Sequence, residues 1–268
     1  MNVLVCVKQV PDTTEIRIDP VKNTLIREGV PSIVNPFDGY ALEAAARLKD
    51  RNPNTTIYVM SMGPEQAKAA LKECLAIAAD KAFLVSGRSF GGSDTLATSY
   101  ILSEAVKKLE EKEQIRFDAI FCGKQAIDGD TGQVGPELAE HLNRGQVTYA
   151  LETEEREESL LVLREGQDAN ERIEVTLPCV VTFTKPSFEP RYPTIRRKLA
   201  ANRAEITVLT PEDFPEMNAE MIGLKGSPTH VKRTFVPQKK KNGIVIREDS
   251  AEVASEKLLK LLGDERLV

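Results

Sequence analysis

The chain has 268 residues and a formal net charge of −5; 41% of its residues are hydrophobic and 29% are charged. This length can bury a substantial core, so we expect one large domain with an appendage. The mildly acidic, mixed charge gives no support to a nucleic-acid partner. The apolar run at residues 1–7 is too short to span a membrane and is not followed by a cleavage site, so we expect a cytoplasmic protein without a membrane span.

The chain contains four cysteines and two histidines, His141 and His230. The cysteines lie far apart without a CxxC pair, and no histidine falls within ligand spacing, so a metal site is not expected. Three of the cysteines occur in apolar runs, where a free thiol behaves as a small hydrophobic group. We expect buried thiols at Cys6, Cys122 and Cys179.

Short apolar runs alternate with segments of helical period through the first half of the chain. The apolar runs occupy residues 3–7, 55–60, 82–85 and 119–122, and the helical segments occupy residues 39–49, 65–78 and 95–109. The alternation predicts an α/β, Rossmann-like fold, in which helices flank a mostly parallel sheet. Ligands of such sheets bind at the carboxyl ends of the strands, near a change in strand order. The loops expected there are residues 8–14 with 35–38, 61–64, 86–94 and 123–135.

The last of these loops joins an apolar strand at residues 117–122 to a helical segment at 136–142. Its glycines would let the backbone approach a ligand, and the amides at the start of a helix attract anions. Adenine-nucleotide binding is therefore the first hypothesis, although tight turns and helix caps also require Gly and Asp. The spacing matches neither the dinucleotide fingerprint nor the P-loop. The glycines concerned are Gly123, Gly129, Gly132 and Gly135.

The start of the following helix can be placed in two ways. Asp130 and Gln133 have the spacing of a capping box, which would begin the helix at Thr131 and present the amides of residues 132–134. Alternatively, the helix begins at Gly135 with Pro136 in its first position.

The pattern changes after residue 146, where short strands at residues 160–163 and 173–177 are separated by polar turns. We expect additional antiparallel strands over residues 146–184, with a hairpin tip at 152–158. Further strands are predicted at residues 178–183 and 204–209.

Two segments of the C-terminal third are not part of this strand pattern. Residues 189–198 form a basic loop that runs into a helix, and an exposed cationic cap is the favoured interpretation without other information. Periodicity is lost after residue 229, and an amphipathic helix follows at 251–262. We expect a main domain at residues 1–229 and a C-terminal arm at 230–268, which either packs on another subunit or folds back on its own domain.

Five short segments together resemble the beta subunit of electron-transfer flavoproteins, and the resemblance spans nearly the whole chain. They are VLVCVK at residues 3–8, NPF at 35–37, SMGP at 61–64, GKQAID at 123–128 and EPRY at 189–192. The resemblance implies a heterodimer with an alpha subunit that carries FAD, and an adenine nucleotide in the beta subunit. The implied binding residues are Cys6, Asn35, Pro36, Phe37, Asp38, Met62, Gly123, Lys124, Gln125, Ala126, Ile127, Asp128, Gly129, Asp130, Thr131, Gly132, Gln133 and Val134.

Conventional members of this family hold AMP, whereas electron-bifurcating members hold FAD that takes hydride from NADH. This chain is more similar to the bifurcating group, because the small residues at 129–136 leave room for a second phosphate. The segment at residues 90–99 also resembles that group, in which Gly91, Gly92 and Thr95 would lie beside the flavin and the NADH site. Its alternative interpretation is a helix cap at Ser93 or Asp94.

The resemblance also implies the electron acceptors. One electron passes through the alpha-subunit FAD to a flavin dehydrogenase of acyl-CoA or lactate type, and the other reaches ferredoxin or flavodoxin. The cofactor performs the chemistry, so no catalytic side chain is required. The basic loop would dock the dehydrogenase through Tyr192, Ile195, Arg196 and Arg197. A stand-alone nucleotide hydrolase or stress protein of similar fold is disfavoured, because the chain has neither a P-loop nor a metal cluster.

Overall fold

The computed structural model describes residues 1–12, 31–232 and 243–268. The chain divides into two compact units, and the described residues up to Lys232 belong to the first. Residues 243–268 belong to the second, whose helix is α6 (Ala251–Asp264). This helix confirms the one predicted at residues 251–262.

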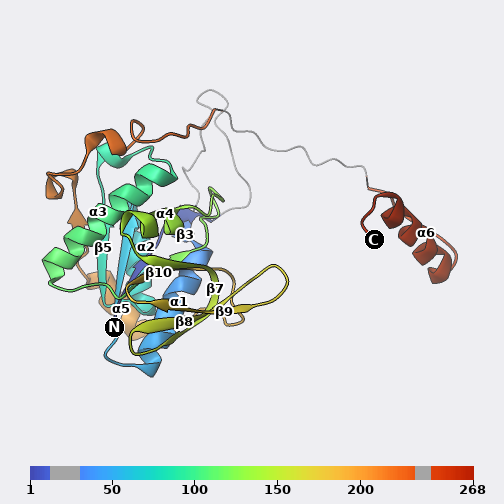
Figure 1. Cartoon of the computed structure of the whole chain (residues 1–268), viewed down its shortest axis with the longest axis horizontal. Helices are drawn as coiled ribbons and strands as arrows, with labels where there is room; N and C mark the ends of the chain where they lie inside the picture. Colours follow the sequence, from blue (N-terminus) through green and yellow to red (C-terminus); the bar gives the residue numbers. More distant parts are fainter. Residues whose placement is uncertain (13–30, 233–242) are drawn as a thin grey trace. The chain divides into compact units, whose positions relative to one another are not determined.

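Parallel strands and helices alternate through the first half of the first unit (Figure 1). The strands are β1 (Asn2–Cys6), β4 (Thr56–Met62), β5 (Lys81–Val85) and β6 (Ala119–Gly123). The helices between them are α1 (Pro36–Arg51), α2 (Lys68–Ile77) and α3 (Thr95–Glu113). Both sets confirm the alternation predicted from the sequence.

The change in strand order lies between β1 and β6. The nine-stranded sheet has the order β11-β5-β4-β1-β6-β10-β7-β8-β9. The chain moves outward from β1 to β4 and β5, and α3 then carries it back to β6 on the other side of β1. Cys6 pairs with Cys122 where these two central strands end. The loops that follow β1 and β6 therefore flank the position at which such sheets bind ligands.

The second half of the sheet is partly antiparallel. Its helices are α4 (Val134–His141) and α5 (Ile195–Arg203), and its strands are β7 (Gly145–Glu155), β8 (Ser159–Arg164), β9 (Glu171–Thr176), β10 (Cys179–Phe183) and β11 (Thr207–Leu209). As predicted, β7, β8 and β9 pair antiparallel. The predicted hairpin tip is shorter than residues 152–158, because β7 continues to Glu155.

The expectation of antiparallel pairing is wrong for β10. This strand lies between β6 and β7 and is parallel to both. All five of its residues are buried, as is typical of a strand covered on both faces of a parallel sheet. β10 thus extends the central sheet beside the loop after β6.

Short elements complete the first unit. β2 (Gln9–Pro11) and β3 (Ser32–Val34) form a separate antiparallel pair. The 3-10 helices are η1 (Glu65–Ala67), η2 (Arg88–Phe90), η3 (Pro211–Asp213) and η4 (Ala219–Met221).

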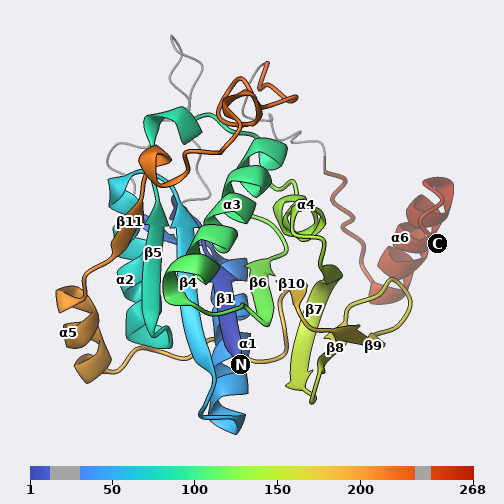
Figure 2. The ribbon, with the colours of Figure 1, turned by 60° about the vertical axis from the view of Figure 1, so that its left-hand side comes forward.

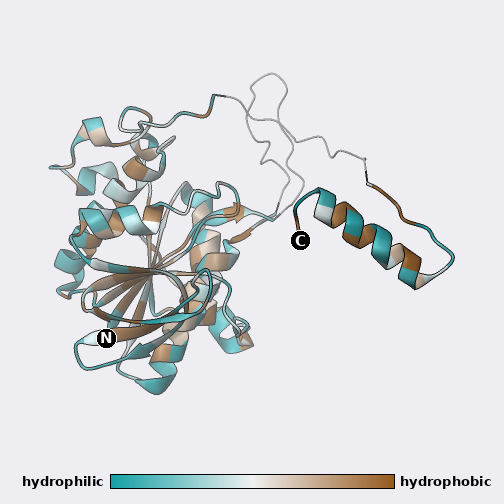
Figure 3. Ribbon diagram, turned by 45° about the vertical axis from the view of Figure 1, so that its right-hand side comes forward, coloured by the Kyte–Doolittle hydropathy of each residue, from teal (hydrophilic) through white to brown (hydrophobic). Residues whose placement is uncertain are grey.

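Alternate residues of the central strands face two separate cores. Val3 and Val5 pack with α1 and α2 on one face, while Leu4 packs with α3 and α4 on the other. Figure 2 shows α3 and α4 in front of the strands, and Figure 3 shows the strands as the most apolar part of this unit. Cysteines 6, 74, 122 and 179 are all buried free thiols, which confirms the prediction for the three in strands. None of the described helices is both long and apolar enough to cross a membrane.

Candidate nucleotide site and docking loop

Asn35 joins the loop before α1 to the loop after β6. Its amide nitrogen donates to Asp38 Oδ1 at 2.9 Å and to the Gln125 carbonyl at 2.8 Å. The backbone N–H of Ile127 donates to Asn35 Oδ1 at 3.1 Å. Because Asn35 is almost fully buried, these bonds are shielded from water and fix the two loops to each other.

Asp38 lies in the first turn of α1 and accepts hydrogen bonds from the backbone of both central loops. Its Oδ2 accepts from Lys8 N at 2.7 Å, and its Oδ1 accepts from Gly123 N at 3.1 Å. Burial raises the pKa of the Asp38 carboxyl to about 7, although the hydrogen bonds from Asn35, Lys8 and Gly123 and the charge of Lys8 oppose the shift. A carboxyl that titrates near neutrality thus lies at the change in strand order.

An ion pair and a left-handed residue hold the outer part of the loop after β6. Lys8 Nζ lies 2.7 Å from Asp128 Oδ1, and Gln125 Nε2 donates to Asp130 Oδ1 at 2.7 Å. Asp130 has a φ of 54° and donates its own N–H to the Ala126 carbonyl. Since its carboxylate is bonded to Gln125, it does not cap the next helix.

The predicted capping box is therefore wrong. α4 begins at Val134 instead of Thr131, and Gln133 is the N-cap residue without a side-chain cap bond. The alternative start at Gly135 is displaced by one residue, which puts Pro136 in the third helical position. Within the described part of the chain, the backbone N–H groups of residues 131–133 find no hydrogen-bond acceptor. These donors precede the positive end of the α4 dipole and can bind an anion.

Different structural features account for glycine at the four glycine positions of this loop. A Cβ at Gly123 would lie 2.4 Å from Asp38 Oδ1, and a Cβ at Gly135 would lie 2.3 Å from Thr182 Cγ2. Gly132 has a φ of 67°, which favours glycine. Only Gly129, among these four, would place a Cβ in open space. Packing and conformation therefore require three of the glycines.

The segment before α3 contacts the same loop. Asp94 is the N-cap of α3 and accepts from Ala97 N at 3.1 Å, which confirms the helix-cap interpretation. Thr95 Oγ1 lies 3.2 Å from both Gln133 Oε1 and Glu137 Oε1. Gly92, with a φ of 78°, precedes this cap. The cap interpretation does not exclude a ligand beside the same residues.

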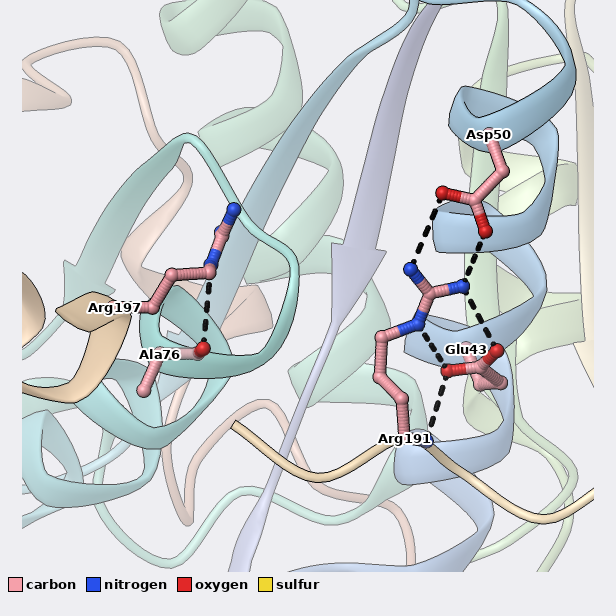
Figure 4. Close-up of polar contacts among 5 residues, drawn as sticks. All are labelled: Glu43, Asp50, Ala76, Arg191 and Arg197. Carbon is pink, nitrogen blue, oxygen red and sulfur yellow. Dashed lines mark hydrogen bonds and ion pairs between the residues drawn. The ribbon is translucent and has the colours of Figure 1, made fainter. Parts of the chain in front are cut away.

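The basic loop is anchored by Arg191, as Figure 4 shows. Its backbone N–H and its guanidinium together donate three hydrogen bonds to the Glu43 carboxylate and two to the Asp50 carboxylate. Glu43 is 6% exposed, and Asp50 lies in the last turn of the same helix. The pairing with Arg191 lowers the pKa of Asp50.

Arg197 is also bonded within the chain. Its guanidinium donates to the carbonyls of Leu75, Ala76 and Ala79, at and just after the end of α2, over 3.0 to 3.2 Å. Figure 4 shows the bond to Ala76. Tyr192 and Ile195, in contrast, are 93% and 82% exposed. We call residues 192–196 the docking loop, after the role that the resemblance implies for them.

Comparison with known proteins decides the family. A protein-family model described as electron transfer flavoprotein domain matches residues 22–214. The chain is 50% identical over 256 residues to the electron transfer flavoprotein subunit beta of Megasphaera elsdenii, an alignment that covers 95% of this chain and 94% of that protein. The chain belongs to the electron transfer flavoprotein beta-subunit family.

Other members of the electron transfer flavoprotein family are similar over their full length. Electron transfer flavoprotein subunit beta of Clostridium acetobutylicum is 48% identical over 97% of this chain and 98% of its own. Caffeyl-CoA reductase-Etf complex subunit CarD of Acetobacterium woodii is 44% identical over 100% of both chains. The resemblance read from the sequence motifs is confirmed at the level of the beta-subunit family.

The fold brings together most of the residues that the motifs predict. Cys6, residues 35–38 and residues 123–130 meet at the ends of β1 and β6, and Gln133 connects them to Thr95. Met62 ends β4, on the opposite side of β1 from β6. The docking loop lies elsewhere, because Asp50 and Ala79 are at the helix ends that precede β4 and β5. It is therefore near the amino ends of the parallel strands, whereas the loops after β1 and β6 lie at their carboxyl ends.

Some residues of both sites were missed by sequence reasoning. Tyr149 has a φ of 58° and is 44% exposed, and Lys124 Nζ lies 4.9 Å from the Phe37 ring centroid and 6.0 Å from that of Tyr149. No sequence signal places Tyr149 there, because its position depends on the pairing of β7 with β10. Glu43 and Asp50 are seven residues apart in a helix, so their shared face was a readable signal.

Proposed function

We propose that this chain is the beta subunit of a heterodimeric electron transfer flavoprotein and that its candidate nucleotide site holds FAD that accepts hydride from NADH. The observation that carries this proposal is the junction of the loops after β1 and β6 through Asn35 and Asp38. Parallel sheets bind nucleotides at such a junction. The family membership of the chain gives the redox context.

The residues present fit a dinucleotide. The N–H groups of residues 131–133, which have no acceptor among the described residues, and the start of α4 suit phosphate oxygens, and Gly129 borders open space. Lys124 supplies positive charge beside the same loop, whereas the charge of Lys8 is paired with Asp128. The buried bonds of Asn35 and Asp38 hold these donors in place before a ligand arrives, which reduces the entropy lost on binding.

When bound, FAD would supply hydride acceptance from NADH and the division of the two electrons between two acceptors. The protein binds and orients the nucleotide and supplies no nucleophile. One acceptor is the FAD of the alpha subunit, which serves a flavin dehydrogenase of acyl-CoA or lactate type. The other is ferredoxin or flavodoxin. The similarity to a subunit of a caffeyl-CoA reductase-Etf complex supports an acyl-CoA enzyme as the partner class.

The docking loop is proposed as the contact with that dehydrogenase, because Tyr192 and Ile195 are exposed apolar side chains in basic surroundings. The C-terminal arm at residues 230–268 is proposed to pack on the alpha subunit. The exposed apolar residues of α6 support this assignment: Val253, Leu258 and Leu259. The protein is proposed to act in the cytoplasm.

The decisive experiment is a cofactor count. The heterodimer is purified, extracted with acid, and its nucleotides are separated and quantified against protein. Two FAD per heterodimer, without AMP, is the expected result. One FAD and one AMP would replace the proposal with the conventional, structural role of the beta-subunit nucleotide.

A further inference from the structure

We infer that Arg191 and Arg197 are positioning residues that fix the two ends of the docking loop on α1 and α2, and thereby hold Tyr192 and Ile195 ready for a flavin dehydrogenase. This inference rests on the proposed docking function. It differs from the role that the sequence motifs imply for Arg197, which was direct contact with the partner.

The first anchor is the residue immediately before the loop. Arg191 donates five hydrogen bonds to two carboxylates of α1, and one of these bonds comes from its backbone N–H. That bond fixes the main chain as well as the side chain. Glu43 is buried, so its negative charge needs a cationic partner in this position. The planar guanidinium presents paired donors to both carboxylates, whereas a lysine ammonium is a point charge without this bidentate geometry.

The second anchor is the residue immediately after the loop. Arg197 binds three carbonyl oxygens at the end of α2, where the helix leaves its last acceptors without intrahelical donors. Its backbone N–H donates to Thr194 Oγ1 at 3.2 Å, so Thr194 caps α5 within the loop. The cation also lies at the negative end of the α2 dipole.

The two anchors act on the residues between them. Tyr192 is adjacent to Arg191, and Ile195 lies two residues before Arg197, so neither side chain is far from a fixed point. Both are exposed and have little packing of their own to hold them. An exposed loop without anchors would lose conformational freedom on docking, and the affinity would fall. The bonds of Arg191 to α1 and of Arg197 to α2 therefore promote binding of the dehydrogenase, although neither arginine contacts it.

The test compares substitutions at anchoring and exposed arginines in the purified heterodimer. Arg197→Met removes the bonds to α2. Arg191→Lys keeps a cation beside buried Glu43 but removes the paired donors of the guanidinium. Arg196→Ala is the control, because Arg196 lies in the same loop, carries the same charge and is exposed. A wild-type assay with NADH, and with ferredoxin as the second electron acceptor, first selects the partner from a short-chain acyl-CoA dehydrogenase and a flavin-dependent lactate dehydrogenase. Dichlorophenolindophenol is a parallel acceptor that needs no docking.

Both anchor variants are expected to raise the KM for the dehydrogenase about tenfold, with kcat and dye reduction unchanged. Hydrogen exchange of the hydrogen-bonded backbone amides at positions 191, 197 and 198 should accelerate at least tenfold beside the substituted anchor. Arg196→Ala should leave this exchange unchanged whatever its effect on KM. An unchanged KM in the anchor variants would overturn the inference, and so would a raised KM without faster exchange, since that result indicates direct contact. If the wild type reduces the dye but neither dehydrogenase, the proposed docking function itself fails.

Discussion

The ammonium of Lys8 lies 2.7 Å from the carboxylate of Asp128, and this ion pair joins the loop after β1 to the loop after β6. The two side chains differ in environment, since Lys8 is 49% exposed and Asp128 is 11% exposed. Solvent therefore screens one partner much more than the other. The pair closes the outer rim of a junction whose inner part is formed by Asn35 and Asp38.

We expect the Lys8 and Asp128 pair to contribute about 0.5 to 1 kcal/mol to stability, because half-exposed ion pairs gain little net energy. A double-mutant cycle with Lys8→Gln and Asp128→Asn, measured by urea unfolding, gives this coupling energy. Adding 1 M salt should reduce it. Lys124→Gln is the control for the loss of a lysine charge beside this loop, because the Lys124 ammonium lies over the Phe37 ring and not beside Asp128. A coupling well above 1 kcal/mol would contradict the prediction.

Alanine substitutions at Gly129 and Gly135 should distinguish a glycine that borders the candidate ligand site from one that is required by packing. Gly129→Ala adds a methyl group to open space, so the unfolding free energy should change by less than about 0.5 kcal/mol. Under the proposed function, its FAD content should fall, because the methyl group enters the ligand site. Gly135→Ala should cost about 1 to 3 kcal/mol through overlap with Thr182.

The second substitution has its own control. Thr182→Ser removes the Cγ2 atom that a Cβ at position 135 would meet and keeps the hydroxyl that accepts from Tyr149 N. The double variant Gly135→Ala with Thr182→Ser should therefore recover most of the lost stability. Equal loss in the single and double variants would show that this contact is not the cause.

The Asp38 carboxyl should make stability fall as pH rises. Its pKa of about 7 in the folded protein exceeds the ordinary value of 3.8, so folding favours the protonated form. The resulting stabilisation is full below about pH 4 and is lost as the pH rises to 7, by about 1.4 kcal/mol for each pH unit. Urea unfolding at pH 5 and pH 8 should show a loss of about 2 to 3 kcal/mol in the wild type beyond that in Asp38→Asn. Equal pH dependence in the two proteins would refute this assignment.

The ring of Tyr149 should stabilise the folded protein, and the left-handed backbone conformation of this residue should destabilise it. Its φ of 58° is unfavourable for a side chain with a Cβ, and glycine adopts it freely. We expect Tyr149→Gly to be more stable than Tyr149→Ala by about 1 kcal/mol in thermal or urea unfolding. Tyr149→Phe keeps the ring beside Lys124 and should match the wild type within about 0.5 kcal/mol. If alanine equals glycine, the left-handed conformation is not present in solution.

The local sequence pattern was sufficient to predict the alternating strands and helices of the first half and the loops at the ends of β1 and β6. The reason is that the spacing of the apolar residues in a strand or helix determines which of its faces is buried. The motifs at residues 35–37 and 123–128 also indicated the family. None of these inferences needed a contact between distant segments.

Tertiary structure alone decided features that depend on such contacts. The insertion of β10 between β6 and β7 could not be read locally, because a short apolar run fits either strand direction. Gly135 resembled a ligand glycine until Thr182 was found against it. The bonds of the Arg197 guanidinium to the carbonyls at the end of α2 also had no signal in the sequence. In each case the partner is distant in the chain, and its identity is fixed by packing in three dimensions.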